Sequence, residues 1–328
     1  MKLRKPDCHV RWPDDFGRRF LISVDTEEEF DWDGPFQREG HGTESVAELQ
    51  TFQAFAETYG VKPVYFIDYA IVEDDRAVAF LKDAAQRKSA EIGVHLHPWV
   101  NPPFEEEVNV YNSFVGNLPK ELEEKKLVAL RDAIRERIGV TPTIYRAGRY
   151  GIGPNTTGLL IKHGFVLDSS IRPRFDYSGQ GGPDFLAAGP EPYWWHGEDK
   201  LLEVPLTTVY SGLFRKQAGL VAGLMEKYPL ANAVLSRSKM LERIPLTPEG
   251  ISARETKEAI DVALDDDLRL LVFSFHSPSL SPGHTPYVRT QQDLDGFYDW
   301  WRDVLDHLEM RNVKPVAIAD LMGAAAGT

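Results

Sequence analysis

The sequence has one cysteine and no long apolar run, and each shortage excludes a class of protein. Cys8 is the single cysteine in 328 residues, so no disulfide can form within the chain. No uninterrupted apolar stretch approaches the ~20 residues that a membrane helix needs. The basic residues near the start are followed by no apolar segment, unlike those of a signal peptide. We therefore expect no transmembrane segment, no signal peptide and a cytoplasmic location.

Basic residues are also in short supply, because 37 lysines and arginines face 50 acidic residues and give a formal net charge of −13. Nucleic acids and anionic membranes attract basic surfaces, so neither is an expected partner. Two sequence signatures are missing as well. There is no Gly-x-Ser-x-Gly pattern, which would indicate a nucleophilic serine, and no glycine loop of the kind that holds phosphates. Water activated by a metal ion is then the favoured nucleophile.

Short apolar strands alternate with helices along most of the chain. This order predicts an α/β fold with a parallel sheet, closed or nearly closed into a barrel, with an open doubly wound sheet as the alternative. We predict a single domain, 1–328, with its core at about 19–319, a long surface loop at 173–196 and a mainly helical insertion at about 211–248. The predicted strands are 19–24, 62–67, 91–96, 143–146, 165–168, 202–205, 269–275 and 315–318, and the predicted helices 45–59, 74–87, 119–138, 155–163 and 294–308.

The first predicted strand ends in acidic residues. Functional side chains of such barrels gather at the carboxyl ends of the strands. Asp25 and Glu27 are two residues apart on an extended chain and would point the same way. Adjacent carboxylates are costly unless a cation or a proton lies between them. The alternative is a solvated acidic loop, since Glu28 and Glu29 follow directly.

Histidines and an arginine end three other strands. His95 and His97 share one strand face, and two imidazoles at that spacing commonly hold zinc. Arg146 would orient a buried carboxylate, or else lie on the surface. His276 directly follows the apolar strand 269–275, where it could serve as a general acid.

Taken in chain order, these segments resemble the five motifs of the polysaccharide deacetylases, also called the NodB-homology or carbohydrate esterase family 4 enzymes. The sequences of the motifs resemble those of the WalW-type subgroup, with His-Leu-His-Pro-Trp at 95–99, Asn-Ser-Phe-Val-Gly-Asn-Leu-Pro at 112–119 and Arg-Ala-Gly-Arg-Tyr-Gly at 146–151. The resemblance spans 19–319 and implies an irregular (β/α)7 barrel.

The resemblance also implies roles for single residues. Asp25 matches the catalytic base, Arg146 the arginine that orients the base, and His276 the general acid. Tyr150 lies near the residue whose backbone amide helps bind the oxyanion. Asp168 lies in the fourth motif, where a carboxylate would tether the acid.

The expected metal ligands depart from the family pattern. The family's second acid directly follows the base, where Thr26 stands here, and its second histidine lies four residues after the first, where Trp99 stands. Glu27, His95 and His97 are then the expected ligands of a divalent ion, with zinc as the expected metal.

The implied function is metal-dependent removal of N-acetyl groups from a sugar in a polysaccharide or its precursor. The partner would be an N-acetylated glycan or glycan precursor. Two alternatives are hydrolysis of another C–N bond in a small amide, and a non-catalytic barrel that binds a glycan or a protein.

Overall fold

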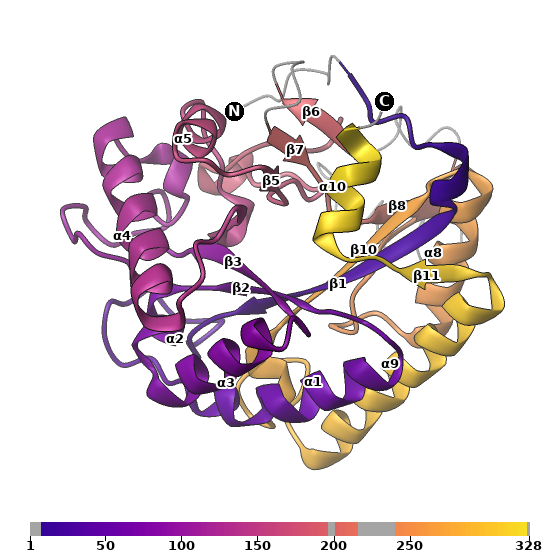
Figure 1. The fold of residues 1–328 in the computed structure, drawn as a ribbon, viewed down its shortest axis with the longest axis horizontal. Coiled ribbons are helices and arrows are strands. Elements are labelled where there is room, and N and C mark those ends of the chain that lie inside the picture. The colour runs from indigo at the N-terminus through magenta and orange to yellow at the C-terminus, as the bar shows by residue number, and fades with distance from the viewer. Residues whose placement is uncertain (1–7, 196–200, 216–239, 327–328) are drawn as a thin grey trace.

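A curled, mainly parallel sheet forms the centre of the protein (Figure 1). The computed structural model describes residues 8–195, 201–215 and 240–326. Within these residues the sheet has nine strands, in the order β10-β1-β2-β3-β4-β5-β7-β6, with β11 paired to β1. Neighbours from β10 to β7 are parallel, and β6 is antiparallel to β7. This arrangement confirms the predicted α/β barrel class. The strands are β1 (Arg18–Thr26), β2 (Val64–Ile67), β3 (Glu91–Leu96), β4 (Ile144–Ala147), β5 (Leu167–Asp168), β6 (Tyr193–Trp195), β7 (Leu201–Glu203), β10 (Leu270–His276) and β11 (Val313–Pro315).

The central strands are buried on both faces of the sheet. In β1 every residue from Phe20 to Thr26 is buried, and all four residues of β2 are buried. This is the pattern expected of parallel strands in an α/β protein. The register between neighbouring strands places their polar carboxyl ends side by side, since Asp25 pairs with His276 and His95 pairs with Arg146.

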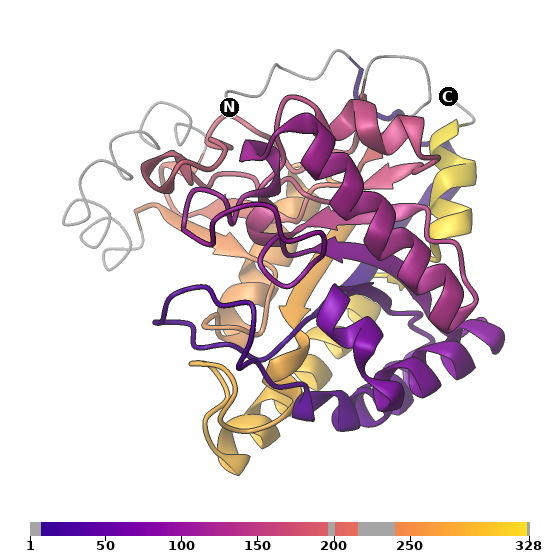
Figure 2. The same ribbon diagram turned by 90° about the vertical axis from the view of Figure 1, so that its left-hand side faces the viewer.

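Helices surround the sheet. Figure 1 shows α1, α3 and α9 in a row along one side, and Figure 2 shows α4 crossing another side. Glycines at positive φ follow two of the helices, Gly139 (φ 86°) after α4 and Gly164 (φ 78°) after α5. The described helices are α1 (Leu49–Thr58), α2 (Tyr69–Glu73), α3 (Asp75–Gln86), α4 (Lys120–Ile138), α5 (Thr156–Lys162), α8 (Ala253–Asp265), α9 (Gln291–Met310) and α10 (Ile318–Ala326).

The barrel closes between β7 and β10 through an antiparallel ribbon of β8 (Thr208–Ser211) and β9 (Glu242–Pro245). The backbone N–H of Thr207 donates to Val272 O (3.2 Å), that of Leu246 to Thr207 O (3.0 Å), and that of Ser274 to Leu246 O (3.2 Å). The segments flanking the ribbon therefore bridge the two ends of the parallel sheet.

Some predicted elements differ from the structure. The helices α8 and α10 are not among the predictions, and the last strand is β11, which ends at Pro315, where the prediction begins its strand. The two ends of the predicted helical insertion, 211–248, contain strand residues of β8 and β9, and its middle, 216–239, lies outside the described residues. In the part of the chain that the structure describes, no helix has both the length and the hydropathy needed to span a bilayer.

Candidate active site

A cavity of about 270 Å³ opens at the carboxyl ends of the parallel strands. Six of the eight predicted site residues line it: Asp25, Glu27, His95, His97, Tyr150 and His276. Arg146 lies directly behind Asp25, with which it forms an ion pair. Asp168 is not among the lining residues.

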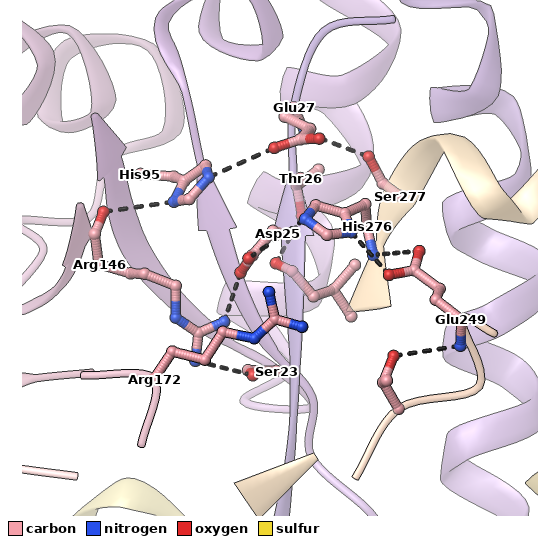
Figure 3. Close-up of polar contacts among 12 residues, drawn as sticks. Ser23, Asp25, Thr26, Glu27, His95, Arg146, Arg172, Glu249, His276 and Ser277 are labelled. Carbon is pink, nitrogen blue, oxygen red and sulfur yellow. Dashed lines mark hydrogen bonds and ion pairs between the residues drawn. The ribbon is translucent and has the colours of Figure 1, made fainter. Parts of the chain in front are cut away.

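Asp25 is a buried carboxylate held by a buried arginine (Figure 3). Arg146 also donates from Nη2 to Ser23 Oγ (2.9 Å) and from Nε to Ser169 O (2.9 Å), so its guanidinium plane is fixed. Burial alone would raise the pKa of Asp25, but the guanidinium of Arg146 lowers it below the ordinary value. Asp25 is therefore ionised at neutral pH, and its orientation is set by Arg146.

Glu27, His95 and His97 converge on one point beside Asp25. The Nε2 atoms of both histidines lie 3.4 Å from Glu27 Oε2, and all three side chains are buried. Burial lowers the pKa of His95 well below its ordinary value and that of His97 to about 4, so both imidazoles are neutral.

These three residues fit a divalent cation. Burial raises the pKa of Glu27 well above its ordinary value. Its buried Oε1 has no hydrogen-bond partner among the described residues. A buried, unsatisfied carboxylate oxygen next to two neutral imidazoles is the donor set that zinc and similar ions take.

A second layer of side chains fixes His97. Its Nδ1 lies 2.9 Å from Glu28 Oε2 and 3.8 Å from Asp68 Oδ2. The indole of Trp99 donates to Glu28 Oε1 (2.6 Å) and stacks on the His97 ring, with 4.3 Å between ring centroids. A carboxylate on the far nitrogen of an imidazole fixes its tautomer and aims its other nitrogen, here at Glu27.

Sequence reasoning missed this layer. The alternative of a solvated acidic loop is wrong for Glu28, because its side chain is fully buried. Asp68 directly follows β2 and also caps α2, since its Oδ1 accepts from Ile71 N (2.8 Å). A polar residue at a strand end is the signal that marked Asp25 and His95, and it applies equally to Asp68.

His276 faces Asp25 across β1 and β10, with its Nε2 3.9 Å from Asp25 Oδ2. Its Nδ1 lies 2.7 Å from Glu249 Oε2, and its backbone N–H donates to Glu249 Oε1 (3.0 Å). Burial would lower the pKa of His276, but the carboxylates of Glu249 and Glu27 raise it to about 10. His276 is therefore an imidazolium at neutral pH, with Glu249 as its counter-ion.

The structure does not place Asp168 where the sequence predicts it, beside His276. Its side chain accepts from Ser170 Oγ (2.5 Å) and forms a buried acid pair with Glu203. Burial raises the pKa of Asp168 to about 6, and burial together with the nearby charge of Asp168 raises the pKa of Glu203 well above its ordinary value. The carboxylate that tethers His276 is Glu249, in the loop between β9 and α8, where no sequence pattern marks it.

Tyr150 lies in a tight turn that follows β4. Arg149 and Tyr150 have φ values of 53° and 58°, in the left-handed region that few non-glycine residues adopt. Gly148 begins the turn against His97, and a Cβ there would lie 2.2 Å from His97 Cδ2. The turn therefore packs directly on the histidine pair and brings Tyr150 to the cavity wall.

No protein-family model matches the sequence, and no curated protein matches it. Solved structures with a similar fold include a probable polysaccharide deacetylase from Pseudomonas aeruginosa PAO1, at 13% identity and a TM-score of 0.51, covering 96% of this chain and 93% of that one. PuuE allantoinase has 14% identity and a TM-score of 0.53, covering 99% and 95%. The 4-alpha-glucanotransferase from Thermococcus litoralis has 12% identity and a TM-score of 0.54, covering 94% and 40%. At these identities the likeness establishes a shared fold.

Proposed function

We propose that the protein is a metal-dependent hydrolase that removes N-acetyl groups from a sugar in a polysaccharide or its precursor. The observation that carries the proposal is one cavity with three chemically distinct parts: an ionised carboxylate, an imidazolium and a buried His-His-Glu group. The motif resemblance supports the deacetylase assignment and, through residues 112–119 and 146–151, the WalW-type subgroup.

The pKa values of the two proton-transfer groups are shifted in opposite directions, and these directions assign their roles. Asp25 has a lowered pKa and His276 a raised one, so at neutral pH one is ready to accept a proton and the other to donate one. Asp25 accepts a proton from water as the water oxygen attacks the acetyl carbonyl carbon. Arg146 keeps that carboxylate oriented. A divalent cation held by Glu27, His95 and His97, with zinc favoured by this donor set, would polarise the carbonyl and lower the pKa of water.

His276 completes the reaction. As the C–N bond breaks, Nε2 of the imidazolium gives its proton to the departing nitrogen, so acetate leaves and the sugar keeps a free amine. Glu249 holds Nδ1 and so turns Nε2 toward Asp25. The backbone amide of Tyr150 is our candidate for stabilising the oxyanion.

The proposal is tested by supplying zinc-loaded protein with N-acetylated oligosaccharides and, separately, with small cyclic amides. We expect acetate and new sugar amines in equal amounts, measured by enzymatic acetate assay and amine labelling. Hydrolysis of the cyclic amides alone would replace the proposal with another C–N hydrolase. Glycan binding without any hydrolysis would identify a non-catalytic barrel.

The Glu249→Gln variant is expected to lose activity at a lower pH than the wild type. The carboxylate of Glu249 is the largest of the charges that raise the pKa of His276 to about 10, so a neutral amide in its place lets burial lower this pKa further. The alkaline limb of kcat/KM therefore moves toward neutral pH, because the acid is protonated over a narrower range. This shift is measured by determining kcat/KM between about pH 6 and 11, at intervals of about half a pH unit.

The matched control is Glu124→Gln, which removes a carboxylate 2.6 Å from another histidine, His163, away from the cavity. Its profile should overlay that of the wild type. An unmoved alkaline limb in Glu249→Gln would show that this carboxylate does not set the protonation of the acid.

A further inference from the structure

Two arginines on the cavity wall have no carboxylate partner. Arg149 follows β4 and Arg172 follows β5, and both line the cavity. Among residues 8–195, 201–215 and 240–326, no carboxylate oxygen lies within 4.0 Å of either guanidinium, by contrast with Arg146, which is paired with Asp25. In a chain with 50 acidic and 37 basic residues, positive charge of this kind in the proposed substrate site calls for an explanation.

Arg172 is held in place by aromatic rings. Its guanidinium carbon lies 4.0 Å from the centre of the Phe175 ring and 5.2 Å from that of Tyr150. Its one hydrogen bond within the described residues runs from Nη1 to Tyr177 Oη (3.1 Å). A guanidinium has five N–H donors in a planar fork, so most of them are uncommitted. Figure 3 shows the side chain pointing toward the centre of the site, where Asp25 and His276 lie.

Arg149 is held in a similar way by neutral groups. Its guanidinium carbon lies 4.1 Å from the Phe114 ring centre and 4.9 Å from that of Phe36. Its side-chain partners are the hydroxyl of Ser113 and the amide oxygen of Gln180. These contacts fix the guanidinium without neutralising its charge.

The acids of the cavity do not balance these arginines. Asp25 is paired with Arg146 and Glu249 with His276, and Glu27 belongs to the metal group. The other lining acid, Asp31, is exposed, and it forms no ion pair with either arginine. Cations enclosed by a cavity are stabilised by an anion, and planar guanidinium forks match carboxylates and phosphates.

We propose that the substrate carries an oxyanion, a carboxylate or a phosphate, and that Arg172 binds it with Arg149 as a second positive charge. The proposal rests on the deacetylase function above and narrows its substrate to an anionic N-acetylated glycan. Because the arginines and the proton-transfer pair line one cavity of about 270 Å³, the charge lies on the N-acetylated sugar or on its immediate neighbour.

The test compares three ligands by calorimetric binding and by kcat/KM for acetate release, using zinc-loaded protein. They are N-acetylglucosamine 1-phosphate, a disaccharide of N-acetylglucosamine and glucuronic acid, and the neutral N-acetylglucosamine disaccharide. We expect an anionic ligand to be preferred by at least about 10-fold, the size of one charge-assisted hydrogen bond. The preferred anionic ligand distinguishes phosphate from carboxylate.

The Arg172→Gln variant is expected to reduce the ratio of anionic to neutral affinity by about 10- to 100-fold. Arg149→Gln is expected to reduce the same ratio less. Arg302→Gln is the control, because Arg302 also lies over an aromatic ring, Phe55, but on the exposed face of α9, where it pairs with Asp299. Circular dichroism verifies folding, and Arg172→Lys, which keeps the charge but loses the planar fork, provides a second variant at this position.

The outcomes separate this inference from the proposed function. Equal binding of anionic and neutral ligands, unchanged in Arg172→Gln, would overturn the inference even if acetate is released. Tighter anionic binding that Arg172→Gln abolishes, with no acetate from any ligand, would uphold the anion site and reject the deacetylase.

Discussion

The Asp25→Asn variant is expected to turn over an N-acetylated substrate about 10²- to 10⁴-fold more slowly than the wild type, the usual size of a general-base contribution. An amide cannot accept the proton that the attacking water must lose. The metal group should be intact, because Glu27, His95 and His97 converge without using the Asp25 side chain. Steady-state kinetics and zinc content of the same preparation measure both effects.

Loss of this carboxylate also leaves Arg146 buried without its counter-ion, which costs about 3–5 kcal/mol of folding free energy in comparable pairs. Turnover is therefore normalised to the folded fraction from circular dichroism. Asp75→Asn removes a carboxylate paired with Arg137 at the surface and should leave turnover unchanged. Near-normal turnover of Asp25→Asn would reject its role as base, and loss of zinc would identify Asp25 as a ligand instead.

Replacing His95 with alanine is expected to abolish stoichiometric metal binding. Two of three donors remain, and Glu27 then lacks one of the two imidazoles that lie 3.4 Å from its Oε2. After incubation with zinc and dialysis, elemental mass spectrometry should find about one ion per wild-type chain and almost none per variant chain, since the donor set is that of a zinc site with three protein ligands. Activity should fall with the metal.

A variant that lowers zinc affinity without abolishing binding strengthens this experiment. Glu28→Gln keeps all three proposed ligands but weakens the carboxylate contact to His97 Nδ1, so zinc affinity should fall by about 10- to 100-fold without being lost. His307→Ala removes a histidine that contacts Asp261 outside the cavity and serves as the control. A wild-type protein that takes up no metal from excess zinc would contradict the assignment of the ligands.

The strands were the most predictable part of this fold. The predicted strand 91–96 coincides with β3, because a short apolar run bounded by polar residues specifies a strand locally. Strand ends then located Asp25, His95 and His276, whose side chains meet because parallel strands end at one edge of the sheet.

Less local features were not predictable in the same way. Glu249 lies in a loop, and only the closure of the barrel brings it to His276. The helix α10 begins at Ile318, within the strand predicted at 315–318, because a short apolar run fits a strand as well as a helix. The start of α8 does carry a local sequence signal, a capping box formed by Ser252 and Glu255, although the helix is not among the predictions.

The pairing of β1 with β10 has a consequence for how the protein is made. Ser23 Oγ donates to Phe273 O (2.8 Å), although the two residues are 250 positions apart. During synthesis, the proposed base and metal ligands, on β1 and β3, leave the ribosome long before the proposed acid on β10. Until then one edge of β1 has no partner strand, and exposed edges of this kind favour aggregation. An interrupted chain would thus carry the proposed metal ligands without the proposed proton donor, so the proposed activity requires completion of the last quarter of the chain.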